Sequence, residues 1–228
     1  MDLGAAKDAP PRAMARGAVA AARNARGLVK DAELLCSAGR LARAYSLAGL
    51  AVEEVGKAGT LATRAAMPEN GRARAPVGRM LAWHQMKLVK GMLTAALPFS
   101  TPGRWTTFVT MPPSKLAEIL DNAQSFAEDM DRLKQRGLYV DVDRTGQIRE
   151  PSEVTVAEVR EQLDRARQAA SAATALLDPS ALLRLADPEA ADVEFSRAVV
   201  SAFGEIGLAR SPEAAADVLR NAAIKLRG

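Results

Sequence analysis

Residues 41–66 have the sequence LARAYSLAGLAVEEVGKAGTLATRAA, which contains no proline and repeats apolar residues at helical spacing. When successive side chains are placed about 100° apart around a helix axis, two apolar faces appear. The first face consists of Leu41, Ala44, Tyr45, Ala48, Ala51, Val52 and Val55, and the second of Leu47, Leu50, Ala58 and Leu61. A helix that is apolar on two faces is expected at the centre of a helical bundle.

The third stripe of this helix carries small and polar residues, namely Ser46, Gly49, Glu53, Gly56, Lys57 and Thr60. Small side chains there would let another backbone or a ligand come close. Glu54 falls among the apolar residues of the second face, where a carboxylate needs a partner or a proton. Glu53 and Lys57 have the i, i+4 spacing of an ion pair on a helix surface.

Helical spacing continues through most of the chain on both sides of this stretch. The predicted helices are 11–38, 41–66, 77–97, 114–136, 156–178, 188–206 and 211–226. Thr155 and Glu158 have the spacing of a capping box at the start of one of them. Alternation on either side of Asp143-Arg-Thr-Gly146 predicts a short β-hairpin near Leu138–Ile148.

These elements predict an all-α fold, with about five core helices in a bundle, a small β-hairpin insertion and two extra C-terminal helices. Residues 1–178 are expected to form one helical domain, and residues 179–228 a helical extension packed on that same domain. Hydrophobic residues make up 48% of the chain but aromatic residues only 4%, so the core must consist mainly of alanine, leucine and valine.

The composition also indicates in which cellular compartment the protein is expected. Cys36 is the one cysteine, so neither an internal disulfide nor a cysteine-based zinc site is expected, which favours a reducing cytoplasm. No apolar run reaches the roughly 18–20 residues needed to cross a bilayer. The N-terminal residues lack the apolar segment of a secretion signal. We therefore expect a soluble cytoplasmic protein with no membrane partner.

Positive charge is concentrated in the first half of the chain. The net charge is +4 overall, +9 over residues 1–110 and −5 over residues 111–228. A basic half is compatible with a polyanionic partner such as RNA. Ordinary solvated surface, or docking of one half of the chain on the other, would also explain the asymmetry.

His84 is the one histidine, and it falls on the apolar face of the predicted helix 77–97, with Lys87 on the flank of that face. It is the one imidazole available for acid–base chemistry near neutral pH. The alternative is a core histidine satisfied by one hydrogen bond. We expect Glu54, Lys57, His84 and Lys87 to form one polar cluster.

Four motifs, in order, resemble the AbiV family of bacterial abortive-infection proteins. They are Asn24 with Asp31-Ala-Glu-Leu-Leu35, Ala44-Tyr-Ser-Leu-Ala48 followed by Ala51-Val-Glu-Glu-Val-Gly-Lys57, His84-Gln-Met-Lys87, and Lys134-Gln-Arg-Gly-Leu-Tyr-Val-Asp141. The resemblance extends from about Asn24 to Ala175. It implies a HEPN-like helical bundle, a fold whose members are often dimeric and often metal-independent ribonucleases.

The usual HEPN signature is an arginine, four to six residues, and then a histidine, which Arg79 and His84 match in spacing. On an ideal helix these two side chains point about 140° apart, which makes Lys87 the better placed cation. The resemblance also marks Tyr139 and Asp141, together with Glu53 and Lys57, as candidate binding residues.

Three hypotheses remain open. The first is an effector that arrests growth by binding the translation machinery, RNA or a phage-encoded activator protein. The second is an endoribonuclease in which His84 transfers the proton, Lys87 and Arg79 stabilise phosphate charge, and Glu54 orients the imidazole. The third is a non-toxic structural or adaptor bundle. No metal or cofactor is expected, and the two apolar faces of helix 41–66 together with the HEPN habit of pairing predict a homodimer.

Overall fold

The computed structural model describes residues 9–66, 154–176 and, between them, residues 114, 118, 122, 125, 128–132, 134, 137–142 and 144–149. The predicted helices 77–97, 188–206 and 211–226 lie outside these residues, as does the extension 179–228. The described residues are mostly helical, which confirms the all-α fold class. None of their helices is long and apolar enough to span a membrane.

The first two helices form an antiparallel pair. Helix α1 spans Pro11–Ser37 and helix α2 spans Leu41–Ala66, within one residue of the predicted bounds. Pro11 is suited to the first turn of α1 because its missing N–H would have no partner there. Gly39 ends that helix with a φ of 72°, a backbone conformation open to glycine at little cost.

Helix α7 spans Val156–Leu176 and begins with the predicted capping box. The Glu158 amide donates to Thr155 Oγ1 at 3.3 Å, and the Thr155 amide donates to Glu158 Oε2 at 2.7 Å. Both hydrogen bonds satisfy amides near the helix start that have no intrahelical partner.

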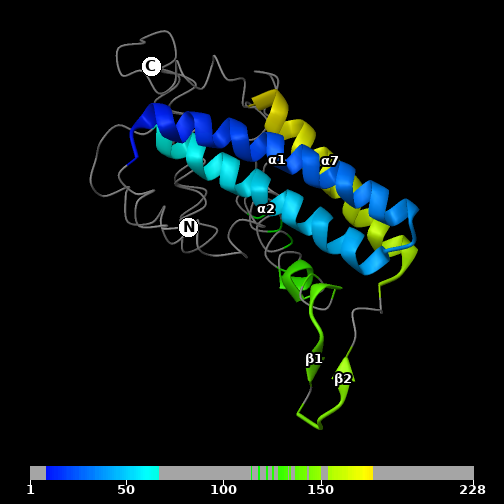
Figure 1. Cartoon of the computed structure of the whole chain (residues 1–228). Helices are drawn as coiled ribbons and strands as arrows, with labels where there is room; N and C mark the ends of the chain where they lie inside the picture. The colour runs from blue at the N-terminus through cyan, green and yellow to red at the C-terminus, as the bar shows by residue number, and fades with distance from the viewer. Residues whose placement is uncertain are drawn as a thin grey trace.

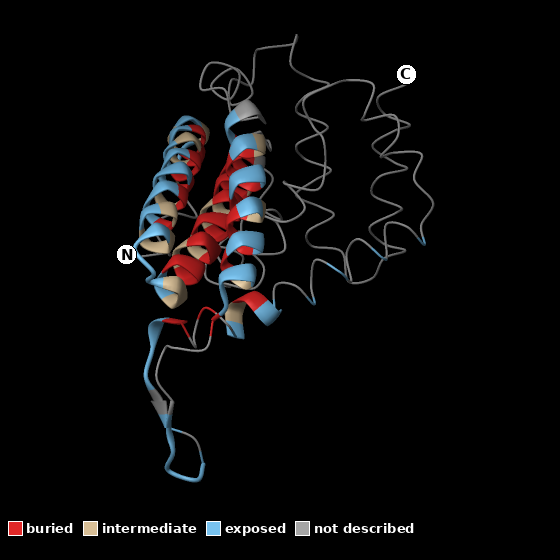
Figure 2. Cartoon of the chain, turned by 90° about the vertical axis from the view of Figure 1, so that its right-hand side faces the viewer, coloured by how far each residue is buried: buried red, intermediate tan, exposed pale blue. Residues whose placement is uncertain are grey.

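Helices α1, α2 and α7 pack side by side, with α2 in contact with both of the others (Figure 1). Most of α2 is buried, whereas α1 and α7 each expose an outer side (Figure 2). Among the described residues, 16 of the 26 buried hydrophobic side chains are alanine. The helices therefore approach closely, as the scarcity of aromatic residues predicted.

A two-stranded β-hairpin extends away from the three helices (Figure 1). Strand β1, Asp141–Val142, pairs antiparallel with strand β2, Ile148–Arg149, so that Val142 faces Ile148 across the ladder. Gly146 supplies the positive φ, 82°, that the turn between them requires. The strands overlap the range in which sequence alternation predicted a hairpin.

Candidate functional site

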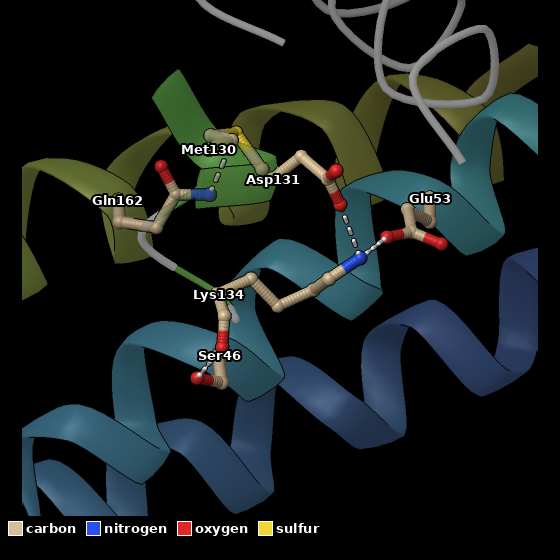
Figure 3. Close-up of polar contacts among 6 residues, drawn as sticks. All are labelled: Ser46, Glu53, Met130, Asp131, Lys134 and Gln162. Atoms are coloured by element: carbon tan, nitrogen blue, oxygen red, sulfur yellow. Dashed lines mark hydrogen bonds and ion pairs between the residues drawn. The ribbon is translucent and has the colours of Figure 1, made fainter. Parts of the chain in front are cut away.

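Part of the polar stripe of α2, at Ser46, Gly49 and Glu53, is covered by residues that precede the hairpin (Figure 3). Ser46, Gly49, Glu53, Gly56 and Thr60 are all buried. Met130 lies over Gly49, where an added Cβ would come 3.5 Å from the Met130 methyl carbon. The small residues of the stripe therefore admit a neighbouring segment of the same chain, which was one of the two possibilities predicted for them.

Lys134 makes the central polar contact of this interface. Its ammonium donates to Glu53 Oε1 at 2.6 Å and lies 3.0 Å from Asp131 Oδ1 (Figure 3). The side chains of Lys134 and Glu53 are only 4% and 5% exposed, whereas Asp131 is 28% exposed. The result is a nearly water-free ion pair with a second carboxylate at its rim.

The carboxylates keep this lysine charged. Burial alone lowers the pKa of Lys134, but the hydrogen bonds to Glu53 and Asp131 outweigh burial and raise that pKa above 10.5. Lys134 therefore stays positively charged at physiological pH, although its side chain is buried.

The backbone near Lys134 sits directly on α2. Ser46 Oγ is 3.0 Å from the Ala42 carbonyl oxygen and 3.3 Å from that of Lys134, so its hydroxyl joins the two segments. A Cβ built on Gly137 would overlap Ser46 Oγ and come 2.7 Å from the Ala42 carbonyl oxygen. Glycine is required at this position because no side chain fits between the two backbones.

The predicted roles of Glu53 and Glu54 are reversed in the structure. Glu53 was expected to pair with Lys57 at the surface, but it is buried against Lys134. Glu54 was expected in an apolar environment, but it is half-buried and accepts a hydrogen bond from Lys57 at 3.3 Å. The physical reason is that Met130, Lys134 and Gly137 lie against the stripe that carries Glu53.

The other candidate residues are placed only in part. Glu54 and Lys57 meet, as predicted for two members of the polar cluster. His84, Lys87 and Arg79 lie outside the described residues. Tyr139 is 59% exposed at the base of the hairpin, and Asp141 begins β1.

This arrangement supports the fold more readily than chemistry on a substrate. A carboxylate and an ammonium that already neutralise each other in the interior offer no free acid or base to solvent. No group of metal-ligating side chains occurs in the part of the chain that the structure describes. The described surface instead offers the hairpin, where Val140, Val142 and Ile148 are 61–64% exposed.

Sequence reasoning missed Lys134, Ser46, Asp131 and Met130 as members of one interface. One signal was present, since Lys134 and Gly137 stand in a motif of their own while Ser46 and Glu53 share a stripe of α2. Pairing the two segments would have required knowing that residues 81 positions apart meet.

Comparison with known families gives one match. The sequence model of the HEPN family described as AbiV matches residues 13–171, a range that runs from the first turns of α1 to the last turns of α7. It therefore includes both halves of the interface between α2 and the segment 128–138. No curated protein and no solved structure shows significant similarity to the chain.

Proposed function

This chain belongs to the AbiV family of HEPN-type abortive-infection proteins, and we propose that it is an antiphage effector that arrests host growth by binding a component of translation or of the phage. Binding is proposed in preference to catalysis. The observation that carries the proposal is the exposed apolar face of the β-hairpin.

This face is formed by Val142 of β1, Ile148 of β2 and Val140, which stands just before β1. Val140 and Val142 are two positions apart in the chain, and Val142 is directly opposite Ile148, so the three share one side of the hairpin. Each is more than 60% exposed. Proteins commonly bind extended peptide segments by pairing them with the edge of a strand.

The hairpin is joined firmly to the helices. Lys134 and Gly137, just ahead of β1, are held on α2 by the ion pair to Glu53 and by the close approach to Ala42. A partner seated on the hairpin would therefore contact a fixed arm rather than a loose loop.

Growth arrest after induced expression tests the proposal. The double variant Val142→Asn/Ile148→Asn should lose arrest, because two polar side chains replace the apolar contact. Leu34→Asn is the matched control, since Leu34 is also an exposed apolar residue, at 68%, but lies on α1. Circular dichroism should show that both proteins fold. Arrest that persists in the folded hairpin variant would contradict the proposal.

Ribonuclease activity is the second candidate, favoured by one observation. Glu54 and Lys57, which belong to a motif shared with the family, form a pair that is still 22% and 32% exposed. Incubation of the purified chain with total RNA tests this function. Cleavage that disappears in both His84→Ala and His84→Gln would establish catalysis and displace the binding proposal. The absence of cleavage, combined with arrest that His84→Gln retains, would support binding.

A further inference from the structure

A row of cations runs along the exposed side of α1. Its members are Arg12, Arg16, Arg23, Arg26 and Lys30, and all five are exposed. At about 100° per residue they lie within about 80° of one another around the helix axis, opposite the face that packs on α2 and α7. The row extends for about 27 Å at 1.5 Å per residue. We call these five residues the α1 cation row.

The row is not balanced by acids. Between Pro11 and Lys30 the sequence contains no aspartate or glutamate. None of the five side chains makes a hydrogen bond or ion pair with a residue that the structure describes. Exposed helix faces that serve only for solubility commonly alternate charges at i, i+4, as Glu161 and Arg165 do on α7.

The charge also opposes the helix itself. The first turn of α1 holds no acidic residue and its N-cap, Pro10, offers no side-chain hydrogen bond. Arg12 therefore lies near the positive end of the helix dipole, where a cation is unfavourable. Five like charges along one face repel one another as well. Such a surface lowers the stability of the free protein and gains from an anionic partner.

From this we infer that the α1 cation row binds the phosphate backbone of RNA. Four of the five cations are arginines, whose planar guanidinium groups form paired hydrogen bonds with phosphate oxygens. Between them lie Val19, Ala20 and Gly27, which are short and uncharged and so leave the longer cations accessible to an extended chain of phosphates.

An anionic lipid surface fits less well. Amphipathic helices bind membranes by inserting an apolar face, but the apolar face of α1 is buried in the protein, including Met14, Ala18, Ala25 and Val29. The inference rests on the proposed function only in naming RNA as the polyanion, because translation offers RNA in abundance.

Fluorescence anisotropy with an unstructured 20-nucleotide single-stranded RNA tests the inference on the full chain. Each phosphate contact adds about 0.7 to the slope of log affinity against log salt. Arg23→Gln/Lys30→Gln should therefore reduce that slope by about 1.4 and weaken binding about 25-fold at 0.1 M salt. The control Arg132→Gln/Arg160→Gln removes the same charge from exposed positions outside the row and should change binding by less than about threefold.

Equal losses in the two double variants would show that only net charge matters and would overturn the inference. So would an unchanged slope in Arg23→Gln/Lys30→Gln, or binding to phosphatidylserine vesicles without binding to RNA. The assay uses no growth readout, so its failure leaves the hairpin experiment intact. Failure of the hairpin experiment likewise leaves RNA binding by α1 testable.

Discussion

The three-helix body and the β-hairpin differ in where their apolar side chains lie. In α1, α2 and α7 the apolar faces are turned inward, and sixteen alanines let the helices approach closely. In the hairpin, Val140, Val142 and Ile148 are turned outward. This difference indicates that the packing of the helices stabilises the described part of the chain, whereas the hairpin adds exposed apolar surface and little stability. Substitutions should therefore separate the two regions.

The largest expected effect on stability is in the body, at the pair between α2 and Lys134. Glu53→Ala leaves the Lys134 ammonium buried beside only the half-exposed Asp131, and should lower the free energy of unfolding by about 3–5 kcal/mol. Urea denaturation measures this. Glu54→Ala, which removes a half-exposed partner of Lys57, should lower it by less than about 1 kcal/mol. A similar loss in both variants would refute the distinction between the two carboxylates.

Gly137→Ala should have the second largest effect on stability, because its Cβ would press on the Ala42 carbonyl oxygen and on Ser46. Relief requires the two segments to separate, at a cost of about 1–3 kcal/mol. Gly27→Ala is the control, since a Cβ there meets nothing within 4 Å and lies inside a helix. It should stabilise the protein by about 0.5–1 kcal/mol. Thermal unfolding of both variants measures these changes. A lower melting temperature in Gly137→Ala alone would show that close packing at Gly137 joins the helices to the segment ahead of the hairpin.

The third largest effect on the free energy of unfolding is expected at alkaline pH. Burial raises the pKa of the Tyr45 hydroxyl from 10.0 to about 12, so the folded state keeps a proton that the unfolded state releases. This contribution is complete below pH 10 and is lost as the pH rises toward 12. The free energy of unfolding should fall by about 1.3 kcal/mol between pH 9 and pH 11.

Tyr45→Phe should flatten that dependence, which urea denaturation across the same pH range would reveal. The raised pKa of Lys134 acts in the same direction, because its stabilising charge is lost as the pH rises above 10.5. Because the ordinary pKa of tyrosine lies below that of lysine, most of the decline below pH 10.5 belongs to Tyr45. An equally steep decline there in Tyr45→Phe would contradict this assignment.

The smallest expected effect lies in the hairpin. Val142→Asn and Ile148→Asn each replace a side chain that is more than 60% exposed. The free energy of unfolding should change by no more than about 0.5 kcal/mol for each. A larger loss in urea denaturation would mean that these side chains belong to the core, and the comparison between body and hairpin would fail.

Local signals explain which parts of the fold could be predicted from sequence. Pro11, Gly39 and the Thr155–Glu158 capping box set helix ends through contacts with their own neighbours, so the bounds of α1, α2 and the start of α7 follow from a few residues each. The turn at Gly146 is equally local. Such features need no knowledge of tertiary packing.

The site could not be predicted in the same way. Which of Glu53 and Glu54 is buried depends on where Lys134 and its neighbours pack, and no property of α2 alone decides which stripe they will cover. The homodimer stays a prediction, but the apolar faces of α2, on which it was partly based, are now largely accounted for. The first apolar face of α2, apart from Leu41, and half of the second are buried within a single chain.

The alanine-rich core has a thermal consequence. The heat capacity of unfolding grows with the apolar area that becomes hydrated, and alanine contributes little of it per residue. Since 16 of the 26 buried hydrophobic residues in the described part of the chain are alanine, this protein should have a heat-capacity increment at or below the usual ~12–15 cal/mol/K per residue. Its free energy of unfolding should then vary little with temperature. Calorimetry would therefore give a stability curve, the free energy of unfolding against temperature, that is broad and shallow rather than sharply peaked.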